Sequence, residues 1–266
     1  MQWSELKILA ARREIIPVVV TGYHETGDHL VVDVSYGEET GFIPVSRMAL
    51  PPNHDTELLL TDLIGQEIEA VIAGVEDSVF AGDRMSAMQR IRGRTPLEKE
   101  TIVKARIRHV LQDVLYGEAA GRLIRIERNA AVRRRTPTLR LVYAPGDEKD
   151  VRIEKVVSPP AEDAPEIYAG NIIAVTENPY KKAMYQPGAR MRATVLRVFD
   201  ESISLSFEPE VIGFAHLPLY PVAPGDEVIV KIDSVKPEEM KIFATIIRKL
   251  GSKMPGKAVI QRRGRY

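Results

Sequence analysis

Histidines and paired carboxylates are the residues of this chain that could carry catalytic or metal chemistry. Of the five histidines, only His24 and His29 lie close together, and no carboxylate pattern nearby completes a metal site. The carboxylate pairs at 147–148 and 226–227 follow Pro-Gly dipeptides, where an Asp side chain ordinarily bonds the turn backbone. Phosphate-loop, dinucleotide-binding and serine-hydrolase motifs do not occur. We therefore expect no enzyme, no cofactor and no metal; an RNA-cleaving enzyme built on these carboxylates is the disfavoured alternative.

The composition describes a globular protein without a net charge. The 266 residues carry 37 acidic side chains against 37 Lys and Arg, and they include no cysteine. The lack of cysteine excludes disulfides and thiol nucleophiles and fits a reducing compartment. No apolar run is long enough to cross a membrane, and the first residues do not read as a secretory signal. We expect a cytoplasmic protein with no membrane partner.

The basic residues are unevenly distributed along the chain. Residues 249–266 contain six Lys and Arg and no acidic residue, so the rest of the chain is correspondingly acidic. A basic end of this kind is usually a solvated tail, but each cation that meets a phosphate releases a counterion and adds affinity. The candidate nucleic-acid contacts in this tail are Arg262, Arg263 and Arg265.

One segment occurs in two similar copies, YAPGDEKDVRIEKV from Tyr143 and VAPGDEVIVKIDSV from Val222. A more divergent copy, LIGQEIEAVIAGV, begins at Leu63. Each copy is a turn followed by alternating apolar residues, the pattern of a half-buried strand. Upstream of each lies a Gly-apolar segment: GFIPVSRM, GRLIRIERN and GFAHLPLY, preceded in turn by β-rich segments. Such repeats of short strands predict small closed barrels, which leave no exposed sheet edge.

The order and spacing of these segments resemble the S1-type RNA-binding domain, an OB-fold barrel named for a bacterial ribosomal protein. The resemblance is carried by GFIPVSRM with LIGQEIEAVI in the first copy and by GFAHL with PGDEVIVKI in the third. In the second copy, GRLIRIERN lacks the aromatic residue and the Pro or His. The resemblance implies a mainly β fold of three tandem five-stranded barrels with short helical connectors.

The composition shifts between the repeats predict the domain boundaries. A Pro- and acid-rich stretch, SPPAEDAPE, is typical of a linker. The following NIIAV segment either completes the second barrel or forms an inserted hairpin. We predict an N-terminal helix at 1–13, barrels at 14–92, 93–160 (divergent) and 186–250, a linker or inserted segment at 161–185, and a basic tail at 251–266.

The resemblance implies that bases stack on aromatic side chains of the central strands while cations follow the phosphates. In the first copy the candidates are Tyr23, His24, His29, Phe42 and Arg47. In the third copy they are Arg192, Arg197, Phe199, Phe214 and His216. In the second copy they are Arg106, Arg108, Arg122 and Arg125, with Arg133, Arg134 and Arg135 in the loop that follows.

Each of these residues also has a purely structural interpretation. Phe42 and Phe214 follow a turn glycine and could belong to a barrel core, and His24 could lie on a polar strand face. The arginine run at 133–135 could be a solvated loop. The second copy offers charge where the family has aromatics, so it either contacts phosphates alone or acts as a spacer.

These observations lead to two functional hypotheses. The first is a non-enzymatic protein that binds single-stranded RNA, or single-stranded DNA, with barrels whose short linkers add their affinities. The second is a structural component of a larger particle, viral or ribosome-associated, in which the barrels contact proteins and the basic tail acts as a clamp. Neutral net charge and the six Phe of the whole chain favour the second hypothesis.

Overall fold

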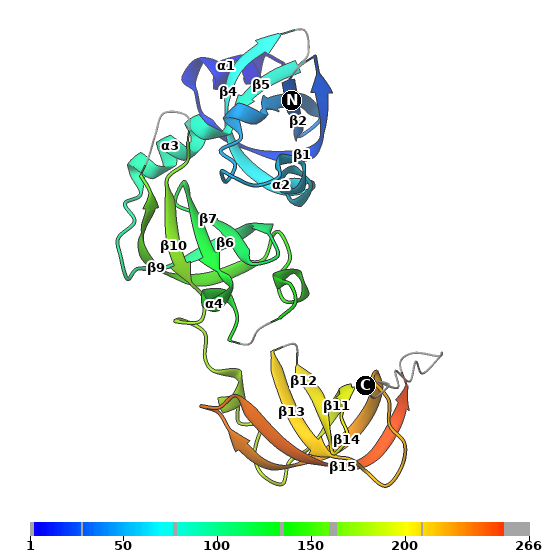
Figure 1. Cartoon of the computed structure of the whole chain (residues 1–266). Coiled ribbons are helices and arrows are strands. Elements are labelled where there is room, and N and C mark those ends of the chain that lie inside the picture. Colours follow the sequence, from blue (N-terminus) through cyan, green and yellow to red (C-terminus); the bar gives the residue numbers. More distant parts are fainter. Residues whose placement is uncertain are drawn as a thin grey trace, which may run out of the picture. The chain divides into compact units, whose positions relative to one another are not determined.

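The computed structural model describes residues 3–27, 29–76, 79–133, 136–159, 164–208 and 210–252. Within them the chain forms three closed five-stranded barrels and a few short helices (Figure 1). The predicted mainly β fold of three barrels is therefore confirmed. Met1–Thr176, with the first two barrels, and Glu177–Tyr266, with the third, are separate compact units.

The first barrel is closed by the strand order β1-β2-β3-β5-β4. Every second residue of its strands enters the core, as with Val18, Val20 and Ile43. The N-terminal helix packs the fully buried Leu6 against this core. The elements of the first barrel, with the N-terminal helix, are α1 (Trp3–Arg12), β1 (Ile15–Thr26), β2 (His29–Tyr36), β3 (Glu39–Pro44), η1 (Val45–Arg47), α2 (Thr56–Leu63), β4 (Glu67–Glu76) and β5 (Val79–Asp83). Helix α3 (Arg84–Arg94) then leads to the second barrel.

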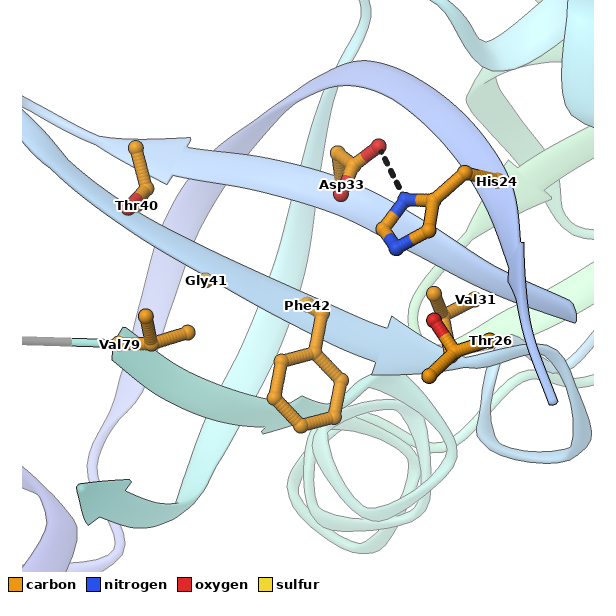
Figure 2. A pocket seen from close by; sticks show the side chains of 8 residues that line it. All are labelled: His24, Thr26, Val31, Asp33, Thr40, Gly41, Phe42 and Val79. Carbon is orange, nitrogen blue, oxygen red and sulfur yellow. Dashed lines mark hydrogen bonds and ion pairs between the residues drawn. The ribbon is translucent and has the colours of Figure 1, made fainter. Parts of the chain in front are cut away.

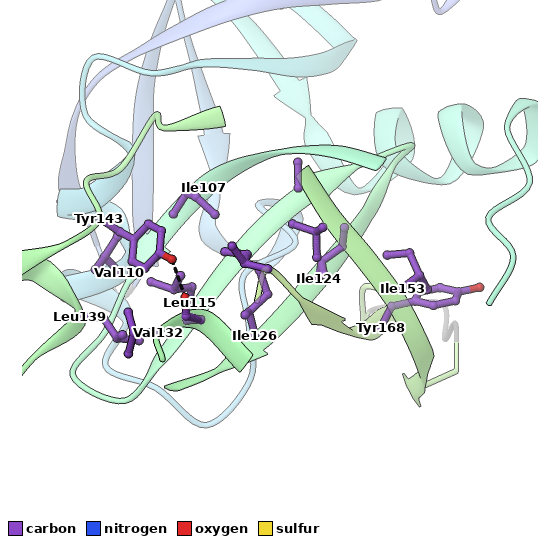
Figure 3. Packing of buried hydrophobic residues seen from close by; sticks show 14 of the residues in the cluster. Ile107, Val110, Leu115, Ile124, Ile126, Val132, Leu139, Tyr143, Ile153 and Tyr168 are labelled. Carbon is purple, nitrogen blue, oxygen red and sulfur yellow. Dashed lines mark hydrogen bonds between the residues drawn. The ribbon is translucent and has the colours of Figure 1, made fainter. Parts of the chain in front are cut away.

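The second barrel has the strand order β10-β8-β7-β6-β9 around an apolar core (Figure 3). In this core Tyr143 donates its hydroxyl proton to the carbonyl oxygen of Ala131 at 2.6 Å. The elements of the second barrel are β6 (Ile102–Val110), β7 (Val114–Ala119), β8 (Arg122–Glu127), α4 (Arg128–Ala131), η2 (Leu139–Leu141), β9 (Glu148–Ser158) and β10 (Ile167–Asn171).

Strand β10 corrects the predicted end of this barrel at residue 160. It pairs in parallel with β8 and antiparallel with β9, which would otherwise present unpaired edges. A Cβ atom at Gly170 would lie 2.4 Å from Ile124 and 2.6 Å from Val151, so only glycine lets the strand cross the core this closely. The segment from 161 to 185 is thus in part the closing strand of the second barrel, and Ile172 beyond it is buried in the same core.

The third barrel repeats the order of the first, as β11-β12-β13-β15-β14. Before it, η3 (Pro179–Lys181) buries Tyr180 against its core, and the Tyr180 hydroxyl accepts the Ile212 N–H at 2.9 Å. The strands are β11 (Arg190–Val198), β12 (Ser202–Glu208), β13 (Val211–His216), β14 (Asp226–Lys236) and β15 (Lys241–Ser252). Strand β15 extends past residue 250, where this barrel was predicted to end, and the tail from 253 lies outside the described residues.

The turn before the fourth strand has the same backbone structure in all three barrels, and it reads Gly-Gln in the first and Gly-Asp in the second and third. Its glycine has a positive φ between 80° and 94°, a region that glycine adopts without steric cost. The glycine N–H donates at 2.7–2.8 Å to the first strand: Gly65 to Val20, Gly146 to Ile107 and Gly225 to Val195. The next aspartate side chain accepts a turn N–H, from Ala144 to Asp147 and from Ala223 to Asp226. In the second and third barrels these carboxylates therefore stabilise the turn that precedes the fourth strand and bonds to the first strand.

Candidate nucleic-acid interface

A β-bulge interrupts the first strand of every barrel at the same place, and it aligns the three barrels residue by residue. The bulge lies between Val20 and Gly22 in β1, between Ile107 and His109 in β6, and between Val195 and Arg197 in β11. The residue after the bulge pairs with a residue of the second strand. That residue pairs with one on the third strand, which in turn pairs with one on the fifth strand. We call these four paired residues the outer rung: Gly22, Asp33, Phe42 and Ala81; His109, Tyr116, Arg125 and Ala169; Arg197, Ser204, Phe214 and Phe243.

In the first barrel the outer rung opens into a pocket of about 360 Å³. Figure 2 shows Phe42 in its lining, with His24 and Asp33 joined by a hydrogen bond beside it. His24 Nδ1 lies 2.9 Å from Asp33 Oδ2, and an ionised carboxylate can only accept, so Nδ1 carries the proton. The lining consists of His24, Thr26, Val31, Asp33, Thr40, Gly41, Phe42 and Val79.

The structure separates the five candidates of this barrel. His24 and Phe42 meet in the pocket, although the sequence placed them on different strands. Tyr23 packs against the barrel core, so its assignment as a stacking residue is corrected: strand alternation turns it away from its neighbour His24. His29 is exposed at the start of β2, and Arg47 is exposed in η1; neither lines the pocket.

In the third barrel the outer rung contains two aromatic residues, of which Phe214 is half-buried and Phe243 is 39% exposed. The rings of Phe214 and Phe243 lie 6.4 Å apart between centroids, tilted by 38°. Phe199, the counterpart of His24, follows β11 and is 48% exposed, and Arg197 is exposed near the end of that strand. Phe243 was missed by the sequence analysis; the alternating KIFATII segment was the signal that could have indicated it.

One of the two other candidates of the third barrel, His216, lies two residues beyond Phe214 and so on the same face of the sheet, whereas Arg192 lies before the bulge of β11. Arg192 is exposed on β11, with its Nη1 3.7 Å from Glu227 Oε2. His216 is exposed at the end of β13, where it pairs with Ser202.

In the second barrel the first two members of the outer rung are buried against the first barrel. His109 and Tyr116 are at most 3% exposed. Tyr116 shares an apolar cluster with Leu59 of α2 and Met88 of α3. The Tyr116 hydroxyl lies 3.0 Å from His54 Nε2, across an edge-on ring contact. This face is therefore an interface between the two barrels of the first unit.

Buried charges complete this interface and correct the assignment of Arg108. Glu118 accepts hydrogen bonds from Arg84 at 2.6 Å and from Arg108 at 2.8 Å, and all three side chains are at most 7% exposed. Arg108 also donates to the backbone oxygen of Glu67 at 2.7 Å. A guanidinium enclosed in this way is not available to a phosphate.

Burial also determines the protonation of Glu118 and of the neighbouring His109. It lowers the pKa of His109 to about 3, and the positive charge of Arg84 acts in the same direction. Burial alone would raise the pKa of Glu118, but attraction to Arg84 and Arg108 and their hydrogen bonds hold it well below its ordinary value. At neutral pH the interface thus contains a neutral imidazole and an ionised carboxylate.

Arg122 is likewise a structural residue and not an exposed cation. Its Nε lies 3.0 Å from Glu166, and its Nη1 donates to the backbone oxygens of Thr95 and Ala120 at 2.7 and 2.8 Å. These bonds hold the start of β8 to the connector that follows α3. The assignment of Arg122 to nucleic-acid binding is therefore corrected as well.

The remaining arginines of the second copy have protein partners on the surface. Arg106 pairs with Glu148 at 3.1 Å and Arg125 with Glu127 at 2.6 Å, each about 40% exposed. Arg133 donates to the backbone oxygens of Ile173 and Thr176 at 2.9 and 2.5 Å. The other predicted contacts lie outside the described residues: Arg134, Arg135, Arg262, Arg263 and Arg265.

In the part of the chain that the structure describes, no three His, Cys, Asp or Glu side chains are grouped so that they could hold a metal ion. None of the helices in those same ranges combines the length and the apolar character needed to span a bilayer.

Comparison with known proteins gives likenesses among solved structures. No family model matches the chain, and no curated protein matches it. Among solved structures, the chain is similar to a multidomain protein with nucleic acid binding domains from Streptococcus pneumoniae TIGR4. The identity is 12%, the match covers 88% of this chain and 73% of that chain, and the TM-score is 0.22. A TM-score of this size does not establish a common arrangement.

Proposed function

We propose that the chain binds single-stranded nucleic acid, in the first place RNA, through the outer rungs of its first and third barrels. One observation carries the proposal: on the outer rung and next to it, equivalent positions of the two barrels carry ring side chains that reach the surface. Phe42 corresponds to Phe214, and His24 corresponds to Phe199. The barrel cores are filled by other residues, so these rings are not needed for packing.

Stacking gives these rings their role. Each base that stacks on an aromatic side chain contributes about 1–3 kcal/mol, with little dependence on sequence. Arg197, on the same outer rung as Phe214 and separated from it by Ser204, supplies a cation for a phosphate of the bound strand. The second barrel, whose rung is covered, acts in this proposal as a structural part of the first unit. Two weak sites on one chain then reinforce each other through their effective concentration.

Fluorescence anisotropy with a labelled, unstructured RNA of about 20 nucleotides tests this function. The full chain is compared with a variant carrying Phe42→Leu, Phe199→Leu and Phe214→Leu, at low salt and at about 200 mM salt. We expect binding that weakens with salt and falls at least tenfold further in the variant. Leu141→Ala, at a 65% exposed site in η2, is the control and should bind like wild type. Absence of binding at low salt would refute the proposal.

A second candidate function, protein docking within an assembly, is favoured by aliphatic exposure on the third barrel. Leu196 and Val198 are 40% and 39% exposed on either side of Arg197. Aliphatic side chains pack well against protein but offer no ring for a base to stack on. If the proposed function holds, replacing both residues with Thr should leave the affinity for RNA within twofold of wild type. If the third barrel instead docks a protein, the same variant should lose its binding to that protein.

A further inference from the structure

The outer rungs of the first and third barrels differ in the polar residue that their second strand contributes. Asp33 stands where the third barrel has Ser204, since each pairs with the phenylalanine of its rung. The Asp33 side chain is 39% exposed, and its hydrogen-bond partner is His24. A carboxylate at this place changes which chemical group can enter.

Asp33 retains acceptor capacity toward the pocket. An ionised carboxylate has two oxygens with about four acceptor sites, and the bond from His24 Nδ1 takes one of them. Both oxygens can therefore accept from a second, planar group, as they do with a guanidinium. The hydrogen bond from His24 also orients the carboxylate on β2.

The pocket lining excludes a phosphate as its occupant. None of the residues that line it is a Lys or an Arg, and the negative charge of Asp33 repels a phosphate. Phe42, Val31 and Val79 instead give it apolar walls. Its occupant must be flat, apolar on its faces, and a donor of hydrogen bonds at its edge.

We propose that this pocket takes a guanine base, with its ring against Phe42 and its N1–H and N2–H groups donating to the Asp33 carboxylate. Among the common bases, guanine has two adjacent donors on its Watson–Crick edge, whereas the others place an acceptor beside a donor and meet the carboxylate with repulsion. Reading of unpaired bases by this edge is the usual way in which single strands are distinguished. The inference rests on the proposed function. It assigns guanine preference to the first barrel, and tolerance of any base to the third.

Short RNAs of one pyrimidine-rich sequence, with a single central guanine, adenine or inosine, test the assignment. Inosine lacks the N2 amino group and so removes one of the two donors. The protein used in this test is the full chain with the substitutions Phe214→Leu and Phe243→Leu, so that RNA binding by the third barrel does not mask RNA binding by the first barrel. We expect guanine to bind about tenfold more tightly than adenine, with inosine in between.

Two variants locate the preference in the protein. Asp33→Asn, which puts a donor where an acceptor is needed, should bind the three RNAs about equally, with circular dichroism and thermal unfolding as the check on folding. Ser204→Ala, at the matched position of the third barrel, should leave the preference unchanged. Equal binding of all three RNAs by the parent protein, or a preference that survives Asp33→Asn, would overturn the inference while the proposed function stands. No binding of any of these RNAs by the chain without substitutions would overturn both.

Discussion

The first and second barrels share a strand order, a bulge and a turn, yet the same face has opposite surroundings in each. In the first barrel the outer rung opens into a pocket that contains Phe42. In the second barrel Tyr116, the counterpart of Asp33, is 3% exposed and packs against α2 and α3. Equivalent strand positions therefore do not imply equivalent function, because the neighbouring element decides whether a face stays open.

Burial of this face imposes its own chemistry on the second barrel. Arginines that would meet phosphates on an open barrel are enclosed here and must be neutralised, as Arg108 is by Glu118. The imidazole of His109 is held neutral for the same reason. The following predictions test this difference between a covered and an open face.

The largest effect is expected from Glu118→Ala, which removes the acid shared by Arg84 and Arg108. Two buried cations would remain without their counterion, and the loss of one partner of a buried ion pair typically costs about 3–5 kcal/mol. Urea denaturation gives the free energy of unfolding, and hydrogen exchange read by mass spectrometry assigns the loss to the first unit.

The matched control for this substitution is Glu148→Ala, which breaks the exposed pair with Arg106. An exposed ion pair contributes about 0–1 kcal/mol, so this variant should remain close to wild type. If Glu118→Ala destabilised the first unit no more than Glu148→Ala, the covered interface would not depend on its buried charges.

A smaller effect is expected from pH. The pKa of His109 is about 3 in the folded state and near 6.5 when unfolded, so between these values the unfolded chain binds the additional proton. The free energy of unfolding should therefore fall as the pH falls, by about 2 kcal/mol between pH 7 and pH 5. His54, whose pKa is lowered by burial, adds to the same trend.

Urea midpoints of the first unit at pH 7 and pH 5 measure this effect, and His109→Gln should flatten it. The third barrel, whose His216 is exposed, provides an internal reference in the same protein. A dependence on pH that is equally steep in His109→Gln would show that another group is responsible.

The smallest effect on RNA binding is expected from the removal of a single arginine, from an open barrel in one variant and from a covered barrel in the other. Arg197→Ala should reduce the slope of log affinity for RNA against log salt by about one, because one phosphate contact is lost. Arg125→Ala, on the outer rung of the second barrel, should leave both slope and affinity unchanged. Titrations of labelled RNA at several salt concentrations test both variants. The reverse order would place the nucleic acid on the second barrel.

Local patterns were sufficient to predict the strands and the turns of this chain. Alternating apolar residues and the repeated Gly-Asp segment predicted three barrels, and the structure confirms them. Their signal is local because period-two alternation and a positive-φ glycine depend on neighbouring residues alone. The sequence left open whether the segment after the linker completes the second barrel or forms an inserted hairpin, since the place of β10 depends on parallel pairing with β8, far away in sequence.

The candidate site shows the same division at the level of single residues. The sequence by itself determined that His24, Phe42 and Phe214 lie on the strands of barrels. Only the tertiary structure decided that Tyr23 turns to the core, that Phe243 joins Phe214, and that Arg108 and Arg122 are enclosed. The reason is physical: a one-residue bulge resets which side chains face outward, and the packing of one barrel on another determines which outward faces meet solvent.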